Sequence, residues 1–336
     1  MDVGQATVPR MVDPAGPRPE ISVVVASHDR PVRLRWLLNA LEEQTLDPAR
    51  WEVVVGHDSH GPETAELLAT HPLARSGRLR HVALPPGSAP PGANRNAALR
   101  LVRADAVLFT DDDCRPPAAW LERALAAARR HTGAVVQGAT RPDPDETNLA
   151  RAPHHETQDI TPPVPWAQTC NIVYPRALIE RVGGFDEQVL VGEDTDLAMR
   201  ARSAGAAYVA APDMVTYHAV HAAPLPRRLR GAWRWRDLPR LVKRHPALRR
   251  EFTWGIFWKP THAWLAPAVC GLALARRRPG AALLVLPWVA HALPDYGPSL
   301  RGRLRALSEL PLAASLDVAE VAALASGSLR DRTLFL

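Results

Sequence analysis

From residue 21 onward, short apolar runs rich in β-branched residues alternate with segments whose apolar residues recur every three or four positions. The run Ile21–Ala26, for example, precedes a segment in which Leu34, Leu37 and Leu41 fall on one helical face. This alternation is typical of three-layer α/β domains with a mostly parallel central sheet. Four strand-to-helix units follow one another before residue 131, so we expect a nucleotide-binding architecture.

The boundaries of the remaining regions follow from changes in composition. Residues 1–19 are rich in Pro and Gly and lack a basic start followed by an apolar run, which predicts a disordered leader rather than a secretory signal. We expect a catalytic domain at 20–222, a basic amphipathic segment at 223–252 and an apolar helical region at 253–336. Within the first of these, residues 141–165 form a long loop typical of a functional lid or an insertion.

The positive charge of the chain is concentrated in one segment. The whole sequence has 41 Lys+Arg and 35 Asp+Glu, a net charge of +6. Residues 224–250 contain ten basic residues and one acid, so they carry +9 and the remainder carries −3. A single basic segment argues against a nucleic-acid partner and favours a local anionic one, such as lipid headgroups or the diphosphate of a lipid-linked acceptor. A solvated amphipathic helix is the alternative.

Two uncharged runs follow the basic segment. Residues 263–275 and 280–293 flank the sequence Arg-Arg-Arg-Pro at 276–279. Each run is shorter than the about 20 residues needed to span a bilayer. Crossing from the cytoplasm would also place three arginines outside, against the positive-inside tendency. We therefore expect a hairpin lying in the membrane interface, with a soluble helical subdomain as the alternative.

Three consecutive carboxylates, Asp111, Asp112 and Asp113, follow the expected strand 106–110. Ligands of open α/β sheets bind at this carboxyl edge. A divalent cation between the groups would offset their repulsion, and hard oxygen ligands suit Mg or Mn. The alternative is a solvated acidic turn before a helix.

Two further helix starts are candidate site segments. Arg95 lies at the start of a helix beginning near Gly92, an arrangement that suits a phosphate or diphosphate. Glu193 and Asp194 open a later helix, where carboxylates serve as caps stabilised by the helix dipole or, beside a metal site, as a catalytic base.

Taken together, these motifs resemble inverting family 2 glycosyltransferases of the GT-A fold. The resemblance covers residues 20–221 in five ordered segments: ISVVVASHDR at 21–30, EVVVGHD at 52–58, NRN at 94–96, DDD at 111–113, and GGFD at 183–186 continuing to ED at 193–194.

The resemblance implies a Rossmann-like three-layer domain and a metal-dependent inverting transfer from a nucleotide-diphosphate sugar, with a UDP-sugar favoured, to an acceptor hydroxyl. The implied roles are nucleotide contact for Ala26 and Asp29, base binding for Asp58, ribose or diphosphate contact for Arg95, ribose contact for Asp111, nucleotide-sugar binding for Asp112, metal binding for Asp113 and His218, and general base for Asp194. One in-line displacement needs only one base, and a divalent cation, Mg or Mn, stabilises the leaving diphosphate.

The sequence departs from the family pattern at the nucleoside end. His57-Asp58-Ser59-His60 stands where two aspartates usually precede a Gly-Ser turn, and Ala26-Ser27-His28 replaces Pro-Thr-Tyr. One acidic contact to the nucleoside that the family pattern supplies is therefore missing here. His221 also competes with His218 for the ligand role.

The acceptor is expected to be a saccharide or a lipid-linked molecule of cell-envelope, glycolipid or polysaccharide synthesis, and the protein to be cytoplasmic at the inner face of the cell membrane. Two alternatives stay open. A sugar-phosphate nucleotidyltransferase would share the layout but is expected to carry a Gly-rich basic signature near the first strand, which this sequence lacks. A degenerate, membrane-associated nucleotide-sugar-binding protein would lack turnover.

Overall fold

The computed structural model describes residues 18–153 and 155–336, which form two compact units. The first unit comprises the described residues up to Pro144, Gln158–Glu187 and Leu197–Ala219. The second comprises Asp145–Thr157, Gln188–Asp196 and Val220–Leu336. Apart from residues 18 and 19, the expected disordered leader lies outside the described residues.

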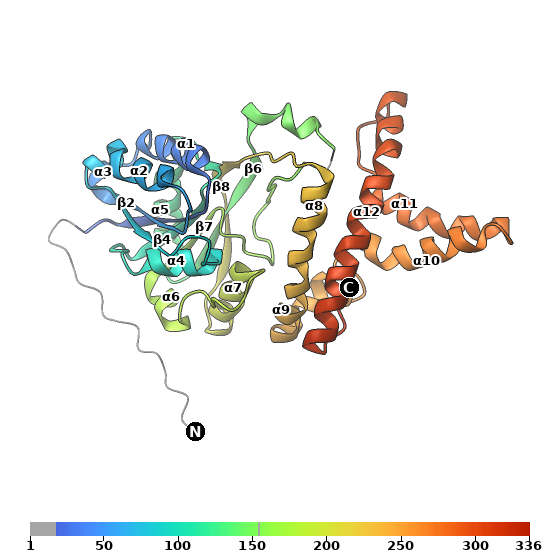
Figure 1. Cartoon of the computed structure of the whole chain (residues 1–336). Helices are drawn as coiled ribbons and strands as arrows, with labels where there is room; N and C mark the ends of the chain where they lie inside the picture. Colours follow the sequence, from blue (N-terminus) through green and yellow to red (C-terminus); the bar gives the residue numbers. More distant parts are fainter. Residues whose placement is uncertain (1–17, 154) are drawn as a thin grey trace, which may run out of the picture. The chain divides into compact units, whose positions relative to one another are not determined.

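The first unit is built on an eight-stranded sheet in the order β3-β2-β1-β4-β7-β6-β8-β5 (Figure 1). The strands are β1 (Ile21–Ser27), β2 (Trp51–His57), β3 (Leu79–Ala83), β4 (Ala106–Asp111), β5 (Cys114–Arg115), β6 (Val135–Pro142), β7 (Ile172–Pro175) and β8 (Tyr208–His218). Strands β3, β2, β1 and β4 run parallel, as does the pair β6 and β8. The pairs β4–β7, β6–β7 and β5–β8 are antiparallel. The sheet is thus parallel in the half formed by β3, β2, β1 and β4 and mixed beyond it.

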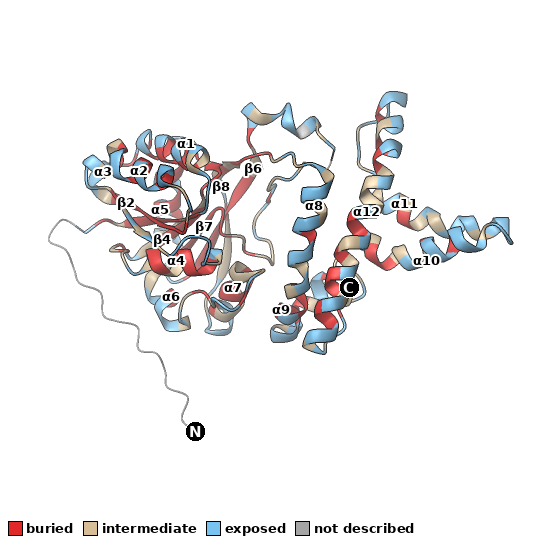
Figure 2. Cartoon of the chain, viewed as in Figure 1, coloured by how far each residue is buried: buried red, intermediate tan, exposed pale blue. Residues whose placement is uncertain are grey.

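Helices cover both faces of this sheet, which makes the predicted three layers. Its helices are α1 (Pro31–Glu42), α2 (Pro62–Thr70), α3 (Pro72–Arg75), α4 (Pro91–Leu99), α5 (Trp120–Arg130), α6 (Arg176–Val182) and the later part of α7 (Glu193–Ser203). Alternate residues of β1 divide between two cores: Val23 and Val25 pack with α1, α2 and α5, whereas Val24 packs with α4, α6 and α7. Figure 2 shows the strands buried between these layers.

The apolar face predicted for the first helix is confirmed, because Leu34, Leu37 and Leu41 of α1 are fully buried. Proline at the first position of α1 fits the helix start, where a backbone N–H has no helical partner. Most predicted elements agree with the structure to within a few residues. Strand β8 is long and continues to His218, at the end of its 11 residues.

The second unit is helical. Its elements include η2 (Pro144–Glu146), η3 (Leu149–Arg151), α8 (Leu225–Ala232), η4 (Trp233–Asp237), α9 (Leu238–Arg244), η5 (Pro246–Glu251), α10 (Pro260–Leu274), η6 (Pro279–Val285), α11 (Leu286–Ala292) and α12 (Leu300–Asp331), with η denoting a 3-10 helix. The predicted apolar hairpin is formed by α10 with η6 and α11. Gly271 allows this close packing, because a Cβ at Gly271 would lie 2.7 Å from the carbonyl oxygen of Ala281.

Helix α12 is the longest element, and sequence reasoning did not single it out. It is long and apolar enough to cross a membrane by length and composition, although 39% of its most apolar window is buried. Its buried carboxylates attach neighbouring segments. Asp317 accepts hydrogen bonds from Trp288 Nε1 (2.9 Å) and Thr261 Oγ1 (3.1 Å). Glu320 Oε2 lies 2.6 Å from Lys259 Nζ and 3.1 Å from His262 Nε2.

Candidate active site

The three carboxylates lie at the carboxyl edge of the parallel half of the sheet, as predicted. Asp111 ends β4 and pairs in register with Ala26 at the end of β1. Asp113 precedes the two-residue strand β5, and its backbone oxygen accepts a hydrogen bond from Ala219 N at 3.0 Å. The edge therefore brings together residues from β1, β4 and the end of β8.

His218 reaches the carboxylates because the extended β8 pairs with β5, which places His218 opposite Cys114. Its Nε2 lies 3.4 Å from Asp113 Oδ1, and its Nδ1 lies 2.8 Å from the carbonyl oxygen of Ala219. Each of Asp111, Asp113 and His218 offers one ligand atom, and these three atoms lie within 4.8 Å of one another. Two carboxylates and an oriented imidazole at this spacing fit a divalent cation.

The competing histidine, His221, is held differently. Its backbone pairs with that of Glu156 in the second unit, with both N–O distances at 2.8 Å. The geometry of the first unit therefore favours His218, and its role as a metal ligand stays a prediction.

Arg30 is the functional candidate that sequence reasoning did not assign. Its Nη1 lies 2.7 Å from Asp113 Oδ2 and 3.4 Å from Asp112 Oδ1. Burial of this guanidinium works against its charged form, but the carboxylates outweigh burial and raise its pKa. The residue stands in the quoted ISVVVASHDR motif, yet the motif alone does not show that its side chain turns to residues more than eighty positions away.

Asp112, like Asp113, is buried. Its Oδ2 accepts a hydrogen bond from Ser27 Oγ at 2.8 Å, and the residue is 4% exposed. Burial, and then the adjacent Asp113 carboxylate, raise the pKa of Asp112 to about 7 although Arg30 opposes them. Crowding of negative charge at this edge is therefore unfavourable until a cation offsets it.

Arg95 of α4 is aimed at the same edge. Its Nη2 lies 2.9 Å from Asp111 Oδ1, and its guanidinium carbon lies 5.6 Å from the centre of the Phe185 ring. The neighbouring Asn96 holds the Phe185 backbone from both sides, accepting from its N–H and donating to its carbonyl, each at 2.9 Å. The motifs at 94–96 and 183–186, distant in sequence, are thus joined in the first unit.

At the nucleoside end, the expected base-binding Asp58 is almost wholly enclosed. It is 1% exposed, and its carboxylate accepts hydrogen bonds from Asn94 Nδ2 (2.8 Å) and the Ala89 backbone N–H (3.1 Å). Its Oδ1 also lies 3.1 Å from His28 Nδ1. Asp29 borders this group from a loop with a positive φ of 50°. The exposed His28 lies beside Asp58 and the exposed His60 contacts Asp29, and both histidines belong to the segments in which the sequence departs from the family pattern.

Asp194 lies in the second unit, in the first turn of α7, where its Oδ1 accepts a hydrogen bond from the Thr195 N–H at 2.7 Å. Two residues on, the fully buried Asp196 lies 2.8 Å from His245 Nε2 and 3.2 Å from Arg244 Nε. Part of the basic segment therefore has a structural role, since it anchors the start of the helix that carries the predicted general base.

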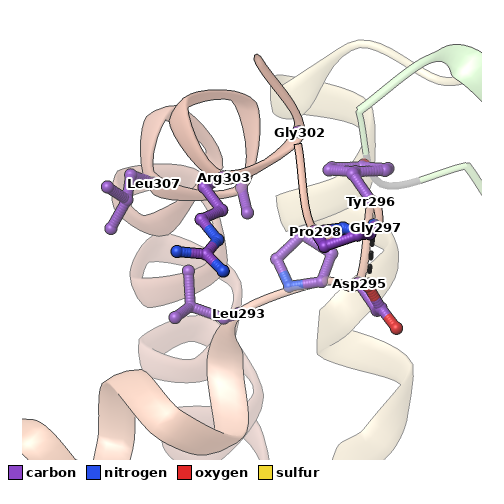
Figure 3. A pocket seen from close by; sticks show the side chains of 10 residues that line it. Leu293, Asp295, Tyr296, Gly297, Pro298, Gly302, Arg303 and Leu307 are labelled. Carbon is purple, nitrogen blue, oxygen red and sulfur yellow. Dashed lines mark hydrogen bonds between the residues drawn. The ribbon is translucent and has the colours of Figure 1, made fainter. Parts of the chain in front are cut away.

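The second unit also has a pocket of about 580 Å³. Figure 3 shows the Arg303 side chain pointing toward Leu293, with Pro298 and Tyr296 to the other side. The lining residues are Leu293, Pro294, Asp295, Tyr296, Gly297, Pro298, Gly302, Arg303, Ala306 and Leu307. The lining is mostly apolar and includes one guanidinium, that of Arg303, and one carboxylate, that of Asp295.

Comparison with known proteins gives consistent matches. Residues 22–186 match the family model described as glycosyl transferase family 2. Over 276 residues the chain is 25% identical to validoxylamine A glucosyltransferase of Streptomyces hygroscopicus subsp. limoneus, covering 71% of this chain and 59% of that protein. It is 29% identical over 221 residues to pre-mycofactocin glycosyltransferase of Mycobacterium tuberculosis, covering 60% of this chain and 43% of that protein. The chain thus spans about half the length of these relatives.

Two solved structures show the same fold. Mannosyltransferase PcManGT from Pyrobaculum calidifontis, in complex with GDP-Man and Mn2+, has a TM-score of 0.54 and 20% identity, covering 94% of this chain and 87% of that chain. S. aureus TarS in complex with UDP-GlcNAc has a TM-score of 0.51 and 18% identity, covering 94% and 92%. Both likenesses place the mixed α/β sheet in the GT-A class.

Proposed function

We propose that this chain, whose residues 22–186 match glycosyl transferase family 2, is a glycosyltransferase that performs metal-dependent, inverting sugar transfer. The donor is a nucleotide-diphosphate sugar, with a UDP-sugar favoured, and the acceptor is a hydroxyl group of a saccharide or lipid-linked molecule. The observation that carries this proposal is the cluster of Asp111, Asp113 and His218, whose ligand atoms lie within 4.8 Å of one another.

Different residues of the first unit would contact the metal and the donor. Asp113 and His218, with Asp111 beside them, would hold a divalent cation, Mg or Mn, which when bound offsets the charge of the departing diphosphate. Arg95, paired with Asp111 at 2.9 Å, would contact the ribose or diphosphate. Arg30 neutralises Asp113 in the absence of other cations and would exchange that partner for the donor phosphates.

Asp194 would act on the acceptor. In an inverting transfer the acceptor oxygen attacks the anomeric carbon as the bond to the diphosphate breaks, and one carboxylate takes the hydroxyl proton. The first turn of a helix favours the ionised form of this carboxylate, which is the form a base needs.

A donor screen tests the proposal. Release of nucleoside diphosphate is measured with UDP-, GDP- and dTDP-sugars, with and without Mn²⁺. The solved structures with GDP-Man and with UDP-GlcNAc are the reason for including two different bases. Turnover with one donor that requires the metal supports the proposal, whereas neither turnover nor nucleotide binding by the intact protein would overturn it.

Asp194→Asn separates the base from the donor site. We expect the rate of sugar transfer to fall by at least about a thousandfold, because the amide of asparagine does not take up the proton of the attacking hydroxyl. The affinity for the donor should stay within a few-fold of wild type. Equilibrium binding of the donor to both proteins is the control. A large loss of donor affinity would instead place Asp194 in the nucleotide or metal site.

We also propose that the second unit attaches the enzyme to the cytoplasmic face of an anionic membrane. Six large apolar side chains of the α10–α11 hairpin are exposed to solvent: Val269, Leu272, Leu274, Leu283, Leu284 and Leu286. Three arginines at 276–278 separate the two arms of the hairpin and suit lipid phosphates. A helix pair with exposed apolar side chains and arginines between its arms would lie along the membrane interface rather than span the bilayer.

Liposome sedimentation tests this attachment. We expect binding to vesicles containing phosphatidylserine, and weaker binding by the double variant L272E/L283E. Val32→Glu, an equally exposed apolar site on α1 of the first unit, is the matched control. Release from membranes by high salt alone would favour the basic segment over the hairpin, and equal binding by all three proteins would contradict the proposed role of the hairpin.

A further inference from the structure

A second metal centre is built from two loops that follow adjacent parallel strands. His28 and Asp29 come directly after β1, and His60 lies in the loop after β2. His28 Nε2 lies 3.5 Å from Asp29 Oδ2, and His60 Nδ1 lies 2.9 Å from the same oxygen. The three ligand atoms lie within 4.8 Å of one another, and all three side chains are accessible to solvent. We propose that His28, Asp29 and His60 bind a transition-metal ion of the zinc type.

The donor set selects the kind of ion. Two imidazoles and one carboxylate suit Zn²⁺, Co²⁺ or Ni²⁺, whereas Mg²⁺ prefers oxygen ligands alone. Zinc–ligand bonds of about 2.0–2.1 Å in a tetrahedron place neighbouring ligand atoms about 3.3 Å apart. The two observed separations from Asp29 Oδ2, 3.5 and 2.9 Å, lie on either side of that value.

Each ligand is oriented by a further partner, which is the feature that distinguishes a built metal site from a chance cluster. His28 Nδ1 lies 3.1 Å from Oδ1 of Asp58, which is 1% exposed and is itself held by Asn94 Nδ2 at 2.8 Å. Histidine ligands of metals commonly donate their second ring nitrogen to a carboxylate in this way. The enclosed Asp58 therefore acts as the outer carboxylate of the site.

Asp29 and His60 are fixed as well. Asp29 Oδ1 accepts a hydrogen bond from the His60 backbone N–H at 2.8 Å, which leaves Oδ2 directed at the two imidazoles. The His60 ring packs over Gly87, where a Cβ would lie 2.7 Å from its Cε1 and Nε2. An ion bound here would hold the loops after β1 and β2 together at the nucleoside end of the sheet. Coordination positions not filled by protein would face solvent.

The test is calorimetric titration of the full chain with Zn²⁺. The Asp113→Asn variant is used as the background, so that the acidic site contributes little to the signal. We expect this variant to bind one Zn²⁺, and the added substitutions His28→Gln or His60→Gln to weaken binding by at least tenfold. Asp58→Asn, which keeps all three ligands, should weaken it by about tenfold through the outer interaction. His131→Gln, a histidine elsewhere in the first unit, is the matched control and should leave binding unchanged.

The outcome does not depend on sugar transfer, because the readout is metal binding alone. If the Asp113→Asn background binds no Zn²⁺, or if His28→Gln and His60→Gln bind it as tightly as the His131→Gln control, the second site is refuted. Circular dichroism of each variant confirms that its fold is retained. A crystal soaked in Zn²⁺ should show anomalous density about 2.1 Å from His28 Nε2.

Discussion

Two clusters in this chain use the same kinds of side chain and differ in their electrostatic state. The acidic edge of the first unit consists of Asp111, Asp112, Asp113, His218, Arg30 and Arg95. The α12 network of the second unit consists of Lys259, Thr261, His262, Trp288, Asp317 and Glu320. Each combines carboxylates, one histidine and at least one cationic side chain in a buried or half-buried setting.

The carboxylates of the acidic edge are only partly neutralised, whereas Glu320 of the α12 network lies beside two basic side chains, Lys259 and His262. Burial and a like-charged neighbour raise the pKa of Asp112 to about 7. In the α12 network, burial also disfavours ionised Glu320, but His262 and Lys259 outweigh burial and lower its pKa. A carboxylate cluster whose negative charge is only partly offset is suited to bind a cation, and one whose carboxylates are matched by basic side chains is suited to join helices. Residue type alone does not distinguish the two.

Asp113→Asn should cause the largest loss of sugar transfer, because it removes a carboxylate charge that the bound cation needs. We expect transfer to fall by at least about a thousandfold, the size of a metal contribution of several kcal/mol. The metal-free variant should be at least as stable as wild type, since repulsion at the edge is relieved. Initial rates and urea unfolding in EDTA measure the two effects, and a destabilised but active variant would place Asp113 among structural residues.

Glu320→Gln should instead lower the stability of the fold. Removing the charge leaves Lys259 and His262 without their buried counter-charge, so we expect a loss of about 3 kcal/mol in the free energy of unfolding. Donor and metal binding by the first unit should be unaffected. Urea denaturation measures the change, and Glu43→Gln on the exposed end of α1 is the control. Equal stability of the two variants would show that the α12 network contributes nothing to the fold.

The two clusters should also differ in the sign of their pH dependence. The native pKa of Asp112 is raised above its ordinary value of about 3.9, so its ionisation destabilises the metal-free fold progressively from about pH 4 to pH 7. The native pKa of Glu320 is lowered, so its contribution is present above about pH 4.3 and is lost as the pH falls through the native value.

Asp112→Asn should therefore stabilise the metal-free protein by on the order of 2 kcal/mol at pH 8 and have little effect at pH 4. Thermal unfolding in EDTA across this range gives the profile. A constant difference between wild type and variant at all pH values would mean that Asp112 does not titrate with the raised pKa.

An exposed ion pair should contribute least to the free energy of unfolding. Arg18 Nη2 lies 2.8 Å from Asp105 Oδ1, but both side chains are more than half exposed. Arg18→Gln should change the free energy of unfolding by less than about 0.5 kcal/mol, because solvent and salt screen such pairs. A loss of unfolding free energy as large as that of Glu320→Gln would show that burial does not determine how strongly an ion pair stabilises this fold.

The sequence predicted the sheet edge well because local pattern determines it. The apolar strand 106–110 and the three following carboxylates lie where the pattern placed them, and the predicted helix faces are buried. Such features depend on residues within one or two turns or on the two-residue period of a strand. The domain boundaries and the role of Asp194 stay predictions.

Other features depend on contacts that local patterns do not encode. Arg30, which follows β1, reaches Asp113, which follows the neighbouring strand β4. His218 reaches Asp113 only because β8 continues to pair with β5. The enclosure of Asp58 by Asn94 and His28 likewise joins three separate loops or helix starts. Sheet register and loop packing decide these contacts, so the sequence could suggest the residue types but not their partners.

The most direct test of the proposed donor site is nucleotide binding measured calorimetrically with the intact protein. UDP and GDP are titrated in Mn²⁺ and in EDTA, for wild type and for Asp113→Asn. We predict that at least one nucleotide binds wild type at least tenfold more tightly in Mn²⁺, and that Asp113→Asn loses this dependence. Binding of equal strength in Mn²⁺ and EDTA, or an unchanged metal dependence in Asp113→Asn, would contradict the assignment of the acidic edge as the metal-dependent donor site.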